Sequence, residues 1–182
     1  MEASPSVTVP RLQTQRLLLR EPRAADFEAF AEHLADPEAT AYLGAADRQT
    51  AWRIFGCHAG LWMLHGAGWW SVSLRETGEI VGHVGAFFRE NMPGIELGWN
   101  TYRAFWGRGF ASEAAAEAMR YALEVRGEPH VRALIDPGNA PSVRVAQHLG
   151  MRYDAATTLF GKPVGRYTLA RGATRSESQG SS

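Results

Sequence analysis

Two glycines and a serine stand directly before a strongly helical run, in the stretch WGRGFAS at 106–112. The first turn of a helix has backbone N–H groups without a partner inside the helix, and the helix dipole adds partial positive charge there. Glycines before such a turn let the backbone approach a ligand closely. The stretch therefore predicts an anion site suited to a phosphate or diphosphate, with Ser112 as the helix cap and Arg108 as a charged donor. The alternative is a turn that binds nothing.

The composition of the chain narrows the classes of protein to which it can belong. Its 182 residues suit one domain, and Lys+Arg equals Asp+Glu at 19 each, which gives no support to nucleic-acid binding. The single cysteine, Cys57, rules out an intrachain disulfide, and the six histidines have no close ligand spacing, so we expect no metal site. No run of residues is apolar enough to cross a membrane, and the N-terminal residues do not form a secretory signal. We therefore expect a cytoplasmic protein without a membrane partner.

The hydrophobic pattern predicts alternating strands and helices. Helices are expected at 24–34, from Asp36 onward, at 51–64, after residue 109 and between 139 and 150. Strands are expected at 16–21, 68–76, 79–88, 95–100, 131–136 and 165–171, with turns at 77–79 and 91–94. This order predicts one mixed α/β domain over 11–171, with helices on both faces of a mixed sheet. The segments 1–10 and 172–182 are short and polar, and we expect them to be flexible.

Four stretches in this order resemble the GNAT superfamily of acyl-CoA N-acyltransferases. They are LQTQRLLLREPRAADFEAF at 12–30, GWWSVSLRETGEIVGHVG at 68–85, GIELGWNTYRAFWGRGFASEA at 94–114 and NAPSVRVAQHLGM at 139–151. The family's (Q/R)xxGx(G/A) loop is matched with Trp106 in the first place, Gly109 at the glycine and Ala111 at the end. Tryptophan there departs from the general pattern and is typical of the subgroup similar to RimJ and RimL, which acetylate ribosomal proteins at the N-terminus.

This resemblance implies a mostly antiparallel sheet in which two neighbouring parallel strands splay apart. Acetyl-CoA would lie in the gap as the co-substrate, with its pantetheine arm along the strand near 97–100 and its diphosphate on the glycine loop. The implied binding residues are Leu97, Gly98, Trp99, Asn100, Gly107, Arg108, Gly109, Ala111, Ser112, Asn139, Ser142 and Arg144. From spacing alone, an ordinary helix cap and an ordinary helix-start serine are the favoured interpretations of Asn139 and Ser142. Arg144 could equally be a solvated surface arginine.

The reaction implied is direct attack of a primary amine on the thioester in a ternary complex. An alkyl amine has a pKa near ~10.4, so a base or desolvation must remove a proton before it attacks. Glu96 is the candidate base, and the alternative is a salt-bridge partner or an outward-facing side chain. Ser142 is the candidate proton donor to the leaving thiolate, because Tyr153 and Tyr167 match the family's tyrosine poorly.

The residues between the first strand and the central hairpin should select the acceptor amine, which is either a protein N-terminus or a small molecule. This segment is rich in aromatic residues, and core packing is the favoured reading of their helical spacing, which puts Trp52, Phe55 and Trp62 on one face. The histidines His58, His65 and His83 are expected to be scattered and structural. Two rival functions stay open, a non-catalytic acyl-CoA-binding or interaction domain and a transferase of longer acyl groups. A homodimer is compatible with the sequence.

Overall fold

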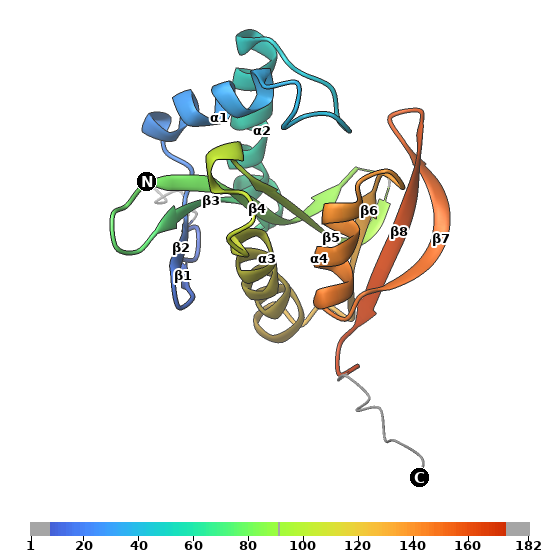
Figure 1. Ribbon diagram of the computed structural model, residues 1–182. Helices are drawn as coiled ribbons and strands as arrows, with labels where there is room; N and C mark the ends of the chain where they lie inside the picture. The colour runs from blue at the N-terminus through green and yellow to red at the C-terminus, as the bar shows by residue number, and fades with distance from the viewer. Residues whose placement is uncertain (1–7, 91, 174–182) are drawn as a thin grey trace, which may run out of the picture.

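The computed structural model describes residues 8–90 and 92–173. Figure 1 labels the elements, which in chain order are β1 (Leu12–Gln13), β2 (Leu17–Arg20), the 3-10 turn η1 (Ala24–Asp26), α1 (Phe27–Ala35), α2 (Arg48–His65), β3 (Gly68–Leu74), β4 (Ile80–Arg89), β5 (Met92–Thr101), the 3-10 turn η2 (Arg103–Phe105), α3 (Phe110–Arg120), the π-helical turn η3 (Tyr121–Val125), β6 (His130–Ile135), α4 (Ala140–His148), β7 (Arg152–Leu159) and β8 (Lys162–Ala170). None of the helices in this described part is long and apolar enough to cross a membrane.

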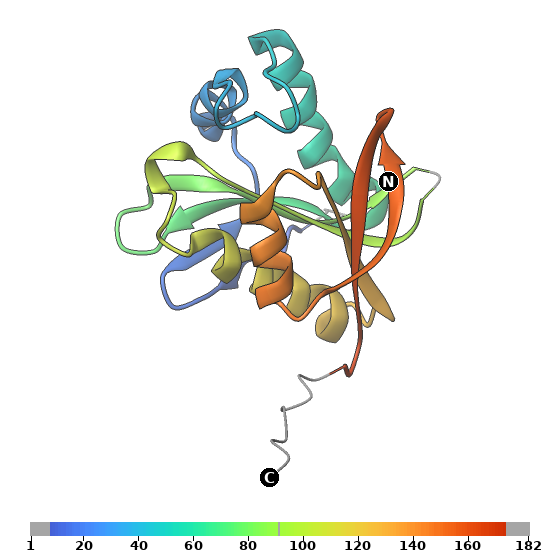
Figure 2. The ribbon, with the colours of Figure 1, turned by 45° about the vertical axis from the view of Figure 1, so that its right-hand side comes forward.

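The described strands form one sheet in the order β1-β2-β3-β4-β5-β6-β8-β7. Their pairings are antiparallel except for β5 and β6, which run parallel. Helices α1 and α2 lie on one face of this sheet, and α3 and α4 lie on the other (Figure 2). The expected fold is therefore confirmed: a mixed α/β domain with a mostly antiparallel sheet, one parallel pair and helices on both faces.

Helix α3 packs closely on the sheet because its inner face is built from alanine. Ala114, Ala115 and Ala118 are at most 4% exposed and belong to the main core, with Ile95 and Leu97 of β5. Small side chains let the helix axis approach the strands, and alanine has the highest helix propensity. This packing fixes the position of the first turn of α3 relative to the end of β5.

The prediction of a helix from Asp36 onward is wrong. The carboxylate of Asp36 accepts a hydrogen bond from the N–H of Glu38 at 2.9 Å, and its carbonyl oxygen accepts one from Thr40 at 3.0 Å, so the chain forms turns there. Gly44 follows in the left-handed region with φ +93, which ends any helical path. The next helix begins at Arg48, after Asp47 caps it through the N–H of Thr50 at 2.7 Å.

Two further expectations about the strands need correction. Strand β7 was not expected, because only half of its side chains are apolar and none of them is fully buried. It pairs along β8 from Arg152↔Thr168 to Leu159↔Lys162, so backbone pairing at the sheet edge stabilises it. The turn expected at 91–94 is also wrong in part, because β5 already begins at Met92.

The two adjacent tryptophans of β3 point to opposite faces of the sheet, as strand geometry requires. Trp70 packs edge-on against Trp62 and Tyr121, and its Nε1 donates to the carbonyl oxygen of Pro10 at 2.7 Å. Trp69 stacks instead on His58, at 4.4 Å between ring centroids. Trp52 was expected on the buried face of α2, yet it is 55% exposed, with aromatic contacts to Phe27 and Phe55.

Candidate active site

Strands β5 and β6 separate soon after they meet. They pair only at Ile95↔Val131 and Glu96↔Arg132. Beyond Glu96, β5 continues to Thr101 alongside β4 alone, while β6 continues alongside β8. One edge of β5 therefore has no strand partner from Leu97 onward, and its backbone N–H and C=O groups are placed to bond an extended ligand.

A cavity of about 640 Å³ lies at this end of β5. That volume is in the range of small-molecule sites. Its walls come from the end of β5, the loop into α3, the first turns of α4 and the connection between α1 and α2 (Figure 1). Nine residues expected in the site line it, namely Trp99, Asn100, Gly107, Gly109, Ala111, Ser112, Asn139, Ser142 and Arg144. Glu96, Leu97, Gly98 and Arg108 are not among its lining residues.

The glycine loop leads directly into α3. Gly107 and Gly109 both have left-handed backbone angles, with φ +74 and +78. Helix α3 begins at Phe110, so the N–H groups of its first turn, which includes Ser112, have no partner inside the helix. The expected cap at Ser112 is wrong: Gly109 is the cap residue and enters the helix from its left-handed conformation.

An ion pair from a distant part of the chain holds this loop in place. Arg16 forms a salt bridge with Glu113 at 2.6 Å, and its Nη1 donates to the carbonyl oxygen of Arg108 at 2.9 Å. Thr14 donates a further hydrogen bond to Glu113. Burial acts to raise the pKa of Glu113, but the bonds from Thr14 and Arg16 lower it below its usual value. The negative charge of Glu113 is thus balanced by Arg16. No local pattern in the sequence indicates this pairing.

Asn139 and Ser142 meet at the start of α4. The side-chain oxygen of Asn139 accepts a hydrogen bond from the N–H of Ser142 at 3.1 Å, so Asn139 is the helix cap. Both residues also line the cavity, as do Arg144 and His148 farther along the same helix. The capping role does not remove Asn139 from the site, because the residue also lines the cavity.

Glu96 lies in a buried ion pair. It is 4% exposed, and Arg89 contacts both of its carboxylate oxygens, at 2.6 and 3.1 Å. Arg132 approaches from β6 at 3.9 Å. Both carboxylate oxygens of Glu96 are thus occupied by hydrogen bonds from one guanidinium. Any role of Glu96 as a base would first require the bond to Arg89 to open.

Gly98 leaves space for the ring of Trp69. A Cβ at Gly98 would lie 2.4 Å from this indole, and one at Gly85 on the neighbouring strand would lie 2.6 Å from it. The indole is stacked between His58, at 4.4 Å between centroids, and Phe87, at 4.9 Å. This part of the aromatic segment is therefore filled by its own side chains, which agrees with the core-packing interpretation.

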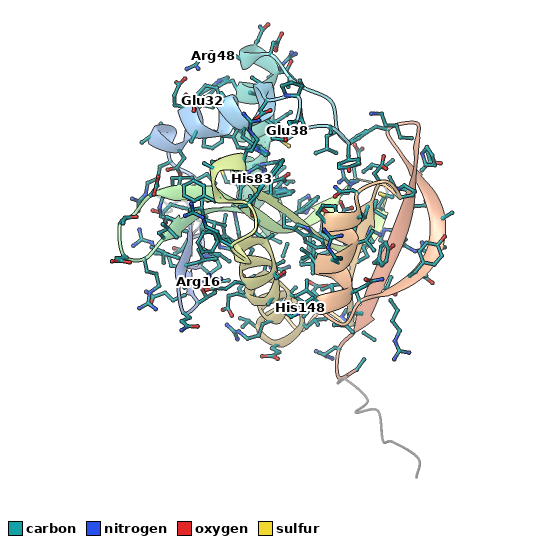
Figure 3. The ribbon with its side chains drawn as sticks, viewed as in Figure 1. Arg16, Glu32, Glu38, Arg48, His83 and His148 are labelled. Atoms are coloured by element: carbon teal, nitrogen blue, oxygen red, sulfur yellow. The ribbon has the colours of Figure 1, made fainter. Side chains whose placement is uncertain are left out.

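Three histidines come together under α1 and α2, where Figure 3 labels His83. The ring centroid of His83 is 5.7 Å from that of His33 and 5.7 Å from that of His58. The expectation of scattered histidines is therefore wrong for His58 and His83, whereas His65 lies against Phe88 instead. Burial lowers the pKa of all three clustered histidines, to about 3 for His58 and well below the usual value for His83. Within the described residues, the Nδ1 atoms of His33 and His83 are buried without a hydrogen-bond partner. Sequence reasoning missed this cluster because its members come from α1, α2 and β4.

Comparison with known proteins agrees with this geometry. Residues 16–152 match the family described as the acetyltransferase (GNAT) domain. A crystal structure of an acetyltransferase from Agrobacterium tumefaciens is 31% identical, with a TM-score of 0.82 over 93% of this chain and 99% of that chain. The uncharacterized protein YkkB of Bacillus subtilis is 36% identical over 57% of this chain and 61% of its own length.

A more distant neighbour shares the fold. RimL, a ribosomal L7/L12 α-N-protein acetyltransferase solved in complex with coenzyme A, is 15% identical, with a TM-score of 0.71 over 92% of this chain and 99% of that chain. Together with the matched domain, which spans more than half of the sequence, these findings show that the chain belongs to the GNAT acetyltransferase family.

Proposed function

We propose that this protein transfers an acetyl group from acetyl-CoA to a primary amine in a ternary complex. The observation that carries the proposal is the free edge of β5, which leads along one cavity to the glycine loop at the start of α3. When bound, acetyl-CoA supplies an acetyl group activated as a thioester. We assign the acetyl transfer to a single domain over residues 11–171.

The residues present fit this co-substrate. Peptide groups of β5 between Leu97 and Asn100 would bond the pantetheine arm, and one N–H there would polarise the thioester carbonyl. The N–H groups of 107–112 would bind the diphosphate, with the helix dipole adding to the attraction. Asn139 and Ser142 would contact the arm from the opposite wall, and Arg144 would contact a phosphate.

The acceptor is proposed to be a protein N-terminus or a small-molecule amine, as in the RimJ/RimL-like subgroup. The Trp106 form of the loop supports this assignment, and so does the structural likeness to RimL at the level of the fold. Glu96 as the base and Ser142 as the proton donor stay predictions.

The test is to measure thiol release from acetyl-CoA with a panel of amines, and to identify the acetylated product by its mass. The panel contains peptides that begin with alanine or serine, a polyamine, an aminoglycoside and hydroxylamine, and a parallel set uses octanoyl-CoA. Transfer from acetyl-CoA to at least one amine is expected. Saturable CoA binding without transfer to any of them would overturn the catalytic proposal in favour of a binding domain.

A pair of arginine variants separates cofactor binding from general loss of folding. Arg144→Gln removes a charge from the cavity wall, so the KM for acetyl-CoA should rise by about tenfold, the loss of roughly one charged hydrogen bond. Arg152→Gln removes an exposed charge on β7, outside the cavity lining, and should leave the KM unchanged. Equal effects of the two variants would contradict the proposed position of the phosphates.

A further inference from the structure

His33 is the buried titratable residue among those that line the cavity. It comes from α1, and together with Trp99 and Asn100 of β5 it lines the cavity. Its side chain is 7% exposed, and its Nδ1 is buried with no hydrogen-bond partner among the described residues. Leaving such an atom unpaired costs about 1–3 kcal/mol.

The surroundings keep this imidazole in its neutral form. Burial lowers the pKa of His33 most strongly, while the side chain of Asn100 and the charge of Asp36 partly oppose that effect. Two further aromatic rings face it, those of His83 at 5.7 Å and Tyr102 at 5.0 Å between centroids. A neutral imidazole with an unpaired nitrogen is a proton acceptor at neutral pH.

The two carboxylates at the nearby wall of the cavity are both bonded to one arginine. Arg103 bonds the carboxylates of both Asp36, at 2.9 Å, and Glu38, at 2.5 Å. Glu38 also lines the cavity, on the connection after α1 that Figure 3 shows above His83. Neither carboxylate is free to act as a base without losing its partner, and Glu96 is held by Arg89.

We infer that His33 is a catalytic residue that takes the proton from the attacking acceptor amine. The inference rests on the proposed acetyl transfer and names the proton acceptor of that site. The amine nitrogen forms the C–N bond to the acetyl carbon as the C–S bond breaks, and the electron pair of that bond leaves with sulfur. Before this attack, the protonated amine gives one proton to the imidazole of His33, which passes it to solvent. The proton that the nitrogen loses on forming the amide reaches the thiolate through solvent.

The test compares His33→Gln with His58→Gln. His58 belongs to the same histidine cluster but is not among the residues that line the 640 Å³ cavity. The rate is measured with two probes, an alanine-first peptide, whose amine is mostly protonated at neutral pH, and hydroxylamine, which is already neutral. Retained CoA binding by His33→Gln, measured by calorimetry, shows that the variant folds.

His33→Gln is expected to lower kcat for the peptide at neutral pH by about 10²-fold or more, and to lower the hydroxylamine rate far less. Its rate with the peptide should rise steadily with pH, because only the free amine then reacts, whereas the wild-type rate falls only once the pH drops below the lowered pKa of His33. His58→Gln should keep the wild-type profile.

A wild-type pH profile in His33→Gln, with CoA bound and the peptide acetylated, overturns the assignment of His33 and leaves the transferase activity standing. An equal loss with both probes also overturns it, because a structural defect does not distinguish amines by basicity. Binding of CoA by the wild type without transfer to either probe or to the wider panel overturns the proposed function, and the role of His33 with it.

Discussion

The buried histidine cluster should make the folded chain sensitive to acid. His83 is 6% exposed, and burial together with the nearby His58 and His33 holds its pKa well below the ordinary 6.5. Above about pH 6.5 the His83 side chain is neutral in both the folded and the unfolded state, so its titration has no effect on stability. As the pH falls below it, the unfolded chain binds a proton that the folded chain does not, so stability decreases.

The size of this loss of stability follows from how far burial lowers the histidine pKa. One pKa unit corresponds to about 1.36 kcal/mol, so at about pH 5 a histidine that stays neutral costs roughly 2 kcal/mol. His58, whose pKa is lowered to about 3, adds a similar cost. The two together amount to about 4 kcal/mol, a large part of the free energy of unfolding of a typical domain.

Urea unfolding at about pH 7 and pH 5 measures the difference. His83→Gln should lose about 2 kcal/mol less than the wild type between the two conditions, because the substituted side chain does not titrate. His65→Gln is the control, since His65 is exposed at the end of α2. A wild-type free energy of unfolding that is unchanged between the two pH values would refute the reasoning.

Three substitutions test the packing that positions the site, each by urea unfolding at neutral pH. Gly98→Ala should cost about 1–3 kcal/mol, because its Cβ meets the stacked ring of Trp69, and an unchanged midpoint would show that the ring moves freely. Asp26→Ala should cost about 3–5 kcal/mol by leaving the buried guanidinium of Arg20 unpaired, and a loss under about 1 kcal/mol would contradict this. Asn139→Ala should cost about 1 kcal/mol by removing the cap of α4, whereas no loss would mean that the cap bond adds nothing.

Local patterns in the sequence predicted the parts of the fold that depend on neighbouring residues. The alanine run of α3, the proline-started α4 that ends near Gly150 and the hairpin of β3 and β4 all have signals within a few residues. The turn after Asp36 was mistaken for a helix because an aspartate before a proline starts both structures. Strand β7 was missed because an edge strand needs little apolar surface.

The surroundings of the site could not be predicted in the same way, because they depend on residues far apart in the chain. Glu96 was selected from its strand, but its contacts with Arg89 and Arg132 follow from strand register. Arg16 reaches Glu113 across 97 positions. His33 gave no signal at all, since only the packing of α1 over β5 brings it to the cavity.

The central claim is that the cavity between β5 and α4 binds acetyl-CoA through the glycine loop. The most direct measurement is the melting temperature with acetyl-CoA, CoA or ATP, for the wild type and for Gly109→Ala. Ligand at about 100 times its Kd should stabilise the fold by about 2.7 kcal/mol, which raises Tm by roughly 5–10 °C. This rise is expected for the wild type with both CoA forms, and little rise is expected with ATP. The rise with the CoA forms should be smaller for Gly109→Ala, because a Cβ is strained at φ +78. No rise of the wild-type Tm with either CoA form would contradict it.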